Sequence, residues 1–324
     1  MTNNPWTLLH AQLHILLKQR QLLPQDSRLL VAVSGGQDSL CLLKLLRDLQ
    51  AKWHWKLAVA HCDHRWPSDQ GMADWVQQLS ATWELPFYLK TAETVRETEA
   101  AAREWRYQSL AEIALTEGFN AVVTGHTKSD RAETLLYNLI RGAGTDGLQA
   151  LWWKRLLTPE VMLVRPLLAV SRQETLEFCQ KWQLPIWEDA ANENLKYARN
   201  RIRQQLIPYL QENFNPQVET ALAQTAEVLR ADVEYLEQVA SQLLETAKAA
   251  DEMALNRYQL RELPLALQRR ILRQFLQQCL ATMPTFEQVE ALVGLLAAAN
   301  RTQTPSLPGG AIAEVRGQWI ILRR

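Results

Sequence analysis

The 324-residue sequence is poor in cysteine, has no net charge and contains no long apolar run. Its four cysteines (Cys41, Cys62, Cys179 and Cys279) are scattered and form no Cys-x-x-Cys pair. That dispersal argues against a zinc ribbon, a cysteine-held cluster and a disulfide framework. No run of apolar residues is long enough to span a bilayer, and the first residues are too polar for a signal peptide. We therefore expect a cytoplasmic protein with no membrane partner.

The absence of net charge limits how this chain can attract nucleic acid. Lysine plus arginine number 35, as do aspartate plus glutamate. A neutral protein lacks an overall field for RNA, so an RNA site requires local segregation of charge. Residues 195–205 show it, with Lys196, Arg199, Arg201 and Arg203 and no acidic residue, and residues 257–273 hold five arginines and one glutamate. Both segments are candidate RNA contacts, although the second is equally well explained as a solvated helix face.

Short β-like runs alternate with helical segments in the first half of the chain. After an amphipathic helix over 6–20, we expect strands at 29–33, 57–60, 87–89, 121–124 and 161–164, and helices near 38–50, 69–83, 99–117, 130–140 and 171–182. This alternation predicts an α/β fold, a mostly parallel sheet with helices on both faces. The length suits about two domains.

The later part of the chain has a different pattern. Helical segments are expected at 195–212, 216–249, 264–281 and 285–299, followed by two short strands joined at Gly317-Gln318. We predict a catalytic domain over residues 1–215 and a mainly helical C-terminal domain over 216–324 that ends in a small β hairpin.

The loop Ser34-Gly35-Gly36-Gln37-Asp38-Ser39 joins the first predicted strand to the next helix. Two glycines permit a sharp turn and let backbone N–H groups approach an anion, and the helix N-terminus adds positive partial charge. The loop lacks the lysine of a Walker A motif, and Asp38 stands where a phosphate would lie. A carboxylate beside a phosphate makes chemical sense if Mg²⁺ bridges them. An ordinary strand–turn–helix, with Asp38 placed by the helix dipole, is the weaker explanation.

Two further polar segments follow predicted strands. His61 and His64 lie three residues apart in His61-Cys62-Asp63-His64-Arg65, and strand-end hydrogen bonding explains them better than a metal site. In Thr124-Gly125-His126-Thr127-Lys128-Ser129-Asp130-Arg131-Ala132-Glu133-Thr134, the acids Asp130 and Glu133 are three apart. The simplest reading of that pair is a capping box, with Asp130 as N-cap and Glu133 at N3.

A third segment is the alanine-rich helix start at residues 99–107. Arg103 and Arg106 share a face of this helix, so either could clamp a phosphate. Pairing of Glu99 with Arg103 on a solvated face is an equally good explanation.

Taken together, these segments resemble the tRNA(Ile)-lysidine synthetases, a family of the PP-loop ATP pyrophosphatase superfamily. The likeness runs from about residue 29 to residue 216 through SGGQDS, HCDHR, EAAAREWRY, TGHTKSDRAET, RGAGTDGLQA, RPLLAVSRQE and EDAANENLKYARNRIRQQLIPYLQENFNP. The chain is similar to short-form members. It departs from the family pattern at Asp63, Arg65 and Ala191, where the family usually has Asn, Gly and Ser.

The resemblance implies a ligase that uses ATP to join free L-lysine to C2 of cytidine 34 in the CAU anticodon of tRNA(Ile). The base is first adenylated, and the lysine amine then displaces AMP. ATP would lie on residues 34–39, with Mg²⁺ held by Asp38 and Asp130. Arg106 or Arg103 would steady the α-phosphate, His126 would contact ATP or the base, and Glu133 with Asp130 would bind the lysine ammonium. The tRNA would lie on Lys196, Arg199, Arg201 and Arg203, and a homodimer is one expected assembly.

Other readings remain. A PP-loop tRNA thiolase is the main alternative, but it normally needs a cysteine pair. A small-molecule ligase would share the loop without the Arg199–Arg203 block or the helical tail. A non-catalytic RNA-binding module would be expected to lose Asp38 or the second acidic site. Arg199 and Arg203 could also pair with Glu188 or Asp189 to fasten the domains.

Overall fold

The computed structural model describes residues 6–66, 69–94, 98–187, 195–249, 253–280 and 282–323. The chain forms two compact units, Met1–Glu227 and Val228–Arg324. This division falls inside the long helix α10 (Val218–Ala247), whereas the predicted domain boundary lies just before that helix. The assignment of a catalytic and a tRNA-binding domain remains a prediction. In the described part of the chain, no helix has the length and apolar character needed to cross a membrane.

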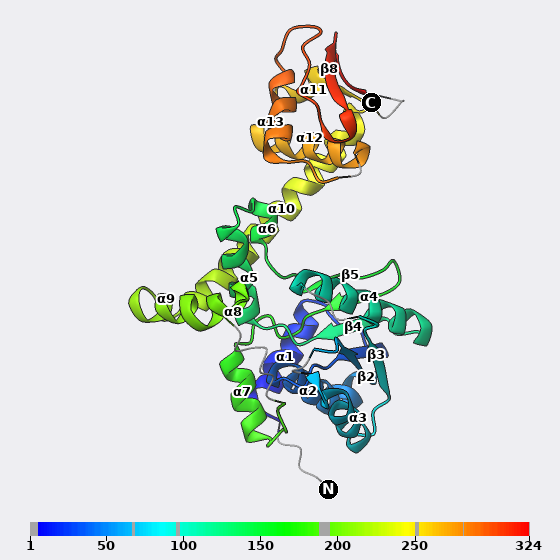
Figure 1. The fold of residues 1–324 in the computed structure, drawn as a ribbon, viewed down its shortest axis with the longest axis vertical. Coiled ribbons are helices and arrows are strands. Elements are labelled where there is room, and N and C mark those ends of the chain that lie inside the picture. Colours follow the sequence, from blue (N-terminus) through cyan, green and yellow to red (C-terminus); the bar gives the residue numbers. More distant parts are fainter. Residues whose placement is uncertain are drawn as a thin grey trace. The chain divides into compact units, whose positions relative to one another are not determined.

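A six-stranded sheet forms the centre of the first unit (Figure 1). Its order is β3-β2-β1-β4-β6-β5, and all neighbouring pairs are parallel except β5 with β6. The strands are β1 (Arg28–Ala32), β2 (Lys56–Asp63), β3 (Phe87–Thr91), β4 (Ala121–Thr124), β5 (Lys154–Leu156) and β6 (Met162–Val164). The predicted α/β fold is confirmed. The antiparallel edge strand β5 was not predicted, because three residues with one partly buried side chain leave little hydrophobic pattern.

Helices cover both faces of this sheet, because successive residues of a strand point to opposite sides. In β1, Leu29 and Val31 belong to one hydrophobic cluster and Leu30 to another. Figure 1 shows α4 on one side of the sheet, and α2 and α3 on the other. The first cluster is completed by α1 (Leu8–Gln19), α2 (Gln37–Trp53), α3 (Met72–Thr82) and α7 (Arg172–Lys181), and the second by α4 (Glu99–Glu117).

A separate cluster joins α5 (Lys128–Ile140) to the helical segment that follows the last strand. Ala132 and Leu136 of α5 pack with Ile202 and Ile207. The segment consists of α8 (Ala198–Arg201), the π-helix η3 (Ile202–Leu206) and α9 (Ile207–Asn213), and the short helix α6 (Thr145–Leu148) follows α5. Packing of the π-helix on α5 brings Arg203 beside the acids of that helix.

The second unit contains a small sheet and several helices. The predicted terminal hairpin is confirmed as β8 (Ile312–Arg316) and β9 (Trp319–Arg323), and a third strand, β7 (Ala254–Asn256), pairs with β9. One face of α12 buries Ile271 and Phe275 in a core shared with this sheet. The other elements of this unit are α11 (Arg257–Leu260), α12 (Leu265–Cys279), α13 (Phe286–Leu295) and the 3-10 turn η4 (Pro308–Gly310).

Candidate active site

The glycine loop between β1 and α2 forms one wall of a pocket of about 370 Å³ at the carboxyl ends of the strands. Gly35 has a φ of 82°, which glycine adopts without strain, and its carbonyl accepts a hydrogen bond from Trp187 N at 3.0 Å. Gly36 is the N-cap of α2 and supplies no capping side chain. The amides at the start of α2 are therefore suited to an anionic ligand.

Gly125, at the end of β4, lies against this loop. A Cβ atom at Gly125 would stand 2.8 Å from the carbonyl carbon and oxygen of Asp38. Real Cβ atoms do not approach backbone so closely, so only glycine allows β4 and the loop to meet. The Thr124-Gly125-His126 segment thus has a steric reason for its glycine.

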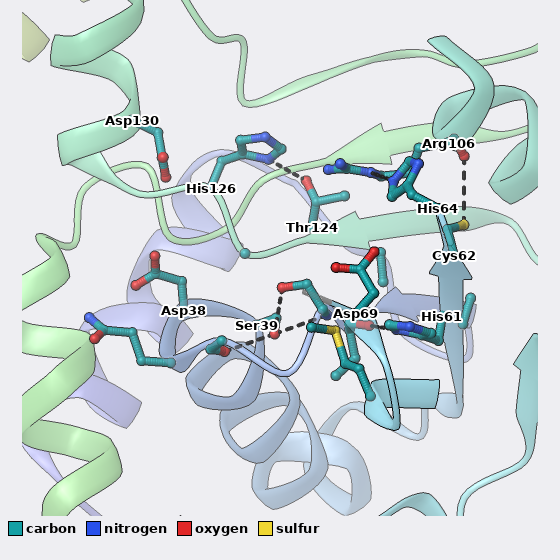
Figure 2. Close-up of a pocket in the computed structure, with 18 of the residues that line it drawn as sticks. Asp38, Ser39, His61, Cys62, His64, Asp69, Arg106, Thr124, His126 and Asp130 are labelled. Carbon is teal, nitrogen blue, oxygen red and sulfur yellow. Dashed lines mark hydrogen bonds between the residues drawn. The ribbon is translucent and has the colours of Figure 1, made fainter. Parts of the chain in front are cut away.

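Asp38 and Asp130 line the pocket and lie one below the other at the left of Figure 2, on different helices. Asp38 Oδ1 accepts a hydrogen bond from Thr175 Oγ1, and Asp38 Oδ2 lies 3.6 Å from Arg172 Nη1. Asp130 Oδ2 accepts hydrogen bonds from Thr127 N at 2.7 Å and Thr127 Oγ1 at 2.9 Å. The predicted capping box with Asp130 as N-cap is wrong, because Thr127 is the N-cap and Asp130 occupies N3.

The two carboxylates differ in their electrostatics. Burial raises the pKa of Asp38, the negative charge of Asp130 adds to this, and Arg172 opposes it. Burial alone would raise the pKa of Asp130, but the Arg203 guanidinium and the hydrogen bond from Thr127 N lower it. A bound cation would favour the ionised form of both acids.

These oxygens fit Mg²⁺, which prefers carboxylates completed by substrate phosphates and water. The described residues contain no group of three or more His, Cys, Asp or Glu side chains that could hold a metal by themselves. A pair of carboxylates beside a phosphate-binding loop suits a metal that arrives with a nucleotide. The roles of Asp38 and Asp130 as metal ligands remain predictions.

Glu133 is buried behind Asp130 and is held by Arg203. Arg203 Nε donates to Glu133 Oε1 at 2.6 Å, and Nη2 donates to Oε2 at 2.8 Å. Arg203 Nη2 also lies 3.4 Å from Asp130 Oδ1. Burial raises the pKa of Glu133, and Arg203 opposes this. Arg203, predicted as a tRNA contact, thus lies in the pocket wall among the acids expected to bind lysine.

His126 and Arg106 lie on the side of the pocket opposite the glycine loop in Figure 2. Burial and the nearby Arg165 lower the pKa of His126 to about 3, so the imidazole is neutral. Its Nδ1 is 2.9 Å from Thr124 Oγ1. Arg106 Nε donates to His64 Nε2 at 3.3 Å. Of the two arginines considered for the α-phosphate, Arg106 lines the pocket and Arg103 does not.

The other predicted tRNA contacts do not line the pocket. Arg201 Nη1 donates to the carbonyl oxygens of Leu195 at 2.8 Å and Lys196 at 2.9 Å, and Arg199 lies over the ring of Tyr137. Glu188 and Asp189, their proposed partners, lie outside the described residues. The side chain of Glu99 lies outside them too, so its pairing with Arg103 is not described.

The second basic segment is largely neutralised. Arg269 makes a two-point ion pair with Glu290, at 2.7 and 3.0 Å, and Arg270 and Arg273 both contact Glu237. These pairs favour the structural explanation of that segment over RNA binding.

The strand-end histidines behave as the sequence suggested. His61 Nδ1 donates to Val33 O at 2.8 Å, a hydrogen bond that links β2 to the residue after β1. Arg65, where the family usually has glycine, has a left-handed φ of 58°, and Asp63 Oδ1 accepts from Arg65 N at 2.7 Å. The Asp63 side chain therefore supports a backbone turn that glycine would make without help. Ala191 lies outside the described residues.

Sequence reasoning missed three side chains at this site. Arg172 and Thr175 are partners of Asp38, and Tyr107 lines the pocket beside Arg106. Arg172 belongs to the RPLLAVSRQE segment and Tyr107 to EAAAREWRY, so both were within recognised motifs. Only the packing of α7 on α2 showed that Arg172 and Thr175 meet the loop.

Comparisons with known proteins agree with this geometry. A family model described as a PP-loop domain matches residues 7–210, and one described as a TilS substrate binding domain matches residues 255–318. The chain is 59% identical to the tRNA(Ile)-lysidine synthase of a Nostoc species, over 98% of this chain and 97% of the relative. It is 56% identical to that of a Synechocystis species, over 97% of both chains.

A solved structure is similar in fold at a greater distance. The U34-tRNA thiolase NcsA from Methanococcus maripaludis, described with its [4Fe-4S] cluster, superposes with a TM-score of 0.57 at 16% identity, over 68% of this chain and 78% of that one. This likeness shows the shared fold alone. The matches to named relatives over nearly the whole length are decisive, and the chain belongs to the tRNA(Ile)-lysidine synthase family.

Proposed function

We propose that this protein ligates free L-lysine to C2 of cytidine 34 in the CAU anticodon of tRNA(Ile), using ATP and releasing AMP and pyrophosphate. The observation that supports this most directly is the meeting of the glycine loop with Asp38, Asp130 and Glu133 in one region of the first unit. A phosphate cradle alone would serve many ATP-using enzymes. The additional acids suit a cationic amine as the second substrate.

The chain's own groups account for the first step. The amides of residues 34–39 bind the phosphates of ATP, and Arg106 steadies the α-phosphate through charge-assisted hydrogen bonds. Mg²⁺ held by Asp38 and Asp130 would supply neutralisation of the charge that develops as pyrophosphate leaves. Neutral His126 adds no charge of its own and can contact the base or ATP through a ring nitrogen. The cytidine must leave its stack to reach this pocket.

The second step needs a neutral amine. The lysine ε-ammonium has an intrinsic pKa of about 10.4, so it must lose a proton before it attacks C2. In this proposal Asp130, which lines the pocket, and Glu133, which is linked to it through Arg203, bind the ammonium and assist that loss. Arg203 already contacts both acids, so the incoming ammonium must replace or share this guanidinium.

The thiolase alternative is not favoured. A sulfur-transferring relative would need adjacent cysteines, whereas Cys41 and Cys179 are buried thiols, and burial raises the pKa of Cys179 to about 12. The described residues hold no cluster of cysteines that could bind iron and sulfur.

The test is incubation of the purified protein with a tRNA(Ile) CAU transcript, ATP, Mg²⁺ and lysine, followed by mass analysis of the digested nucleosides. The proposal expects a nucleoside with the mass of lysidine, with AMP formed in equal amount. A transcript with uridine at position 34 is the matched control and should remain unmodified. No lysidine with the CAU transcript, or a 2-thio product when a sulfur donor is added, would overturn the proposal.

A further inference from the structure

Arginine side chains gather around Tyr107 in the first unit. The guanidinium carbon of Arg103 is 4.9 Å from the centre of the Tyr107 ring, and that of Arg155 is 5.3 Å from it. Arg165 Nη2 donates a hydrogen bond to Tyr107 Oη at 3.3 Å. These cations come from α4, from β5 and from the residue after β6, so the fold concentrates charge that is dispersed in sequence.

No carboxylate balances these three arginines within the described part of the chain. Arg155 Nη1 donates to the Leu156 carbonyl and Arg165 Nη1 donates to the Trp152 carbonyl, while among the described residues Arg103 contacts the Tyr107 ring. Arg165 is 2% exposed, and no described residue accepts a hydrogen bond from its Nε. Burial lowers the pKa of Arg103, and the neighbouring arginines add to this. A partly buried group of like charges is costly unless an anion joins it.

Tyr107 connects this cluster to the pocket. Its Oη accepts the hydrogen bond from Arg165, so its own O–H proton remains available to another acceptor, and no described residue supplies one. Burial would raise the pKa of Tyr107, but Arg165 and Arg103 lower it. A phenol polarised in this way is a strong donor to an anionic oxygen. Tyr107 lines the pocket, whereas Arg103, Arg155 and Arg165 lie outside its lining.

We propose that Tyr107, Arg103 and Arg155 form a binding site for a phosphodiester group of the RNA strand, next to the nucleotide that enters the pocket. Arg165 is a positioning residue that holds the Tyr107 hydroxyl. The inference rests on the proposed function, because it needs an RNA substrate. Forked guanidinium groups suit phosphate oxygens, and such contacts fix the position of a strand rather than its sequence.

The phosphates of ATP have the same chemistry as an RNA phosphodiester, but the residues that line the pocket argue against ATP as the ligand of this cluster. The proposed function assigns the ATP phosphates to the loop at residues 34–39 and to Arg106, and Ser34, Gly36 and Arg106 line the pocket. The predicted RNA contacts Arg201 and Arg203 are already engaged with backbone carbonyls and with Glu133. Arg103 and Arg155, by contrast, have no acid partner among the described residues, and Tyr107 connects them to the pocket wall.

The first test is the double variant Arg103→Gln/Arg155→Gln, with tRNA(Ile) binding measured over a series of KCl concentrations. Loss of one phosphate contact should weaken binding and reduce the slope of log affinity against log salt by about one, with ATP affinity unchanged. Arg47→Gln is the matched control, because Arg47 stacks over Trp83 at 5.2 Å in the same way. An unchanged slope in a folded double variant overturns the proposal. So does a loss of ATP affinity with tRNA binding intact, which would assign the site to the nucleotide.

The second variant is Tyr107→Phe, which keeps the ring and removes the donor. Binding of tRNA should weaken about tenfold, as expected for a hydrogen bond to a charged group, while the salt slope stays that of the parent. Unchanged affinity would exclude Tyr107 from the site.

The proposed function and the proposed phosphate site can fail separately. If the parent protein makes no lysidine but the double variant has a reduced salt slope, the proposed function is wrong and the phosphate site stands. If the parent protein makes lysidine but the salt slope of the double variant is unaltered, the function stands and the phosphate site is wrong.

Discussion

Arg203, in the pocket wall, forms a two-point ion pair with the buried Glu133, with Nε 2.6 Å from Oε1 and Nη2 2.8 Å from Oε2. Glu133 is 3% exposed, so this guanidinium is the main stabilising partner of a buried carboxylate. The same carboxylate is the proposed site for the lysine ammonium. One cation therefore occupies the place where another must bind, and the roles of the two side chains can be separated by substitution.

Glu133→Gln should raise the KM for lysine and slow its attack, while adenylation of the tRNA is less affected. The neutral amide no longer attracts an ammonium, and Arg203 loses its partner at a cost of about 1–3 kcal/mol in stability. The measurements are a lysine titration and, without lysine, release of pyrophosphate.

Arg203→Gln is the companion variant for that measurement. If Glu133 binds lysine directly, Arg203→Gln should retain lysine affinity, because the carboxylate remains. If Glu133 serves only to place Arg203, both variants should lose lysine affinity equally, and the assignment of Glu133 would be wrong.

Asp38→Asn should lower lysidine formation by orders of magnitude with the fold intact. The amide is a poorer metal ligand, and the metal supplies several kcal/mol of stabilisation to the departing pyrophosphate. Turnover is measured over a range of Mg²⁺ concentrations. Asp74→Asn is a matched control, because Asp74 also lies in the first turn of a helix, α3, and is exposed. Parent-like turnover of Asp38→Asn at ordinary Mg²⁺ would rule out the role.

Much of this site could be anticipated from the sequence, and the exceptions have physical causes. The loop at residues 34–39 follows a buried strand and opens a helix, so local pattern and motif agree. Arg203 was predicted as a tRNA contact because its neighbours in sequence are basic, and the sequence did not reveal that packing of the π-helix on α5 gives it acidic partners. Thr175 and Arg172 reach Asp38 only through packing between α7 and α2, which periodicity does not reveal.

Gly125→Ala should weaken ATP binding while leaving most of the fold in place. The added Cβ would lie 2.8 Å from the Asp38 carbonyl and must push β4 and the glycine loop apart. Overpacking of this kind costs about 1–3 kcal/mol. Nucleotide titration beside a thermal melt tests this. Gly144→Ala is the control, because no atom lies within 4 Å of its Cβ position. Normal ATP affinity in Gly125→Ala would contradict the close approach.

His61 should make stability depend on pH below its ordinary pKa of 6.5. Burial lowers the pKa of His61 in the folded protein, although the hydrogen bond to Val33 opposes this. The unfolded chain therefore binds a proton that the folded chain does not. The free energy of unfolding should be unaffected by His61 above pH 6.5 and should fall as pH drops below it, by up to about 1.4 kcal/mol per pH unit.

His126 acts in the same direction, so the informative quantity is the difference between parent and variant. Denaturant unfolding at several pH values should show a shallower slope for His61→Gln than for the parent. Equal slopes in the parent and in His61→Gln would mean that His61 takes up its proton in the folded state as readily as in the unfolded one.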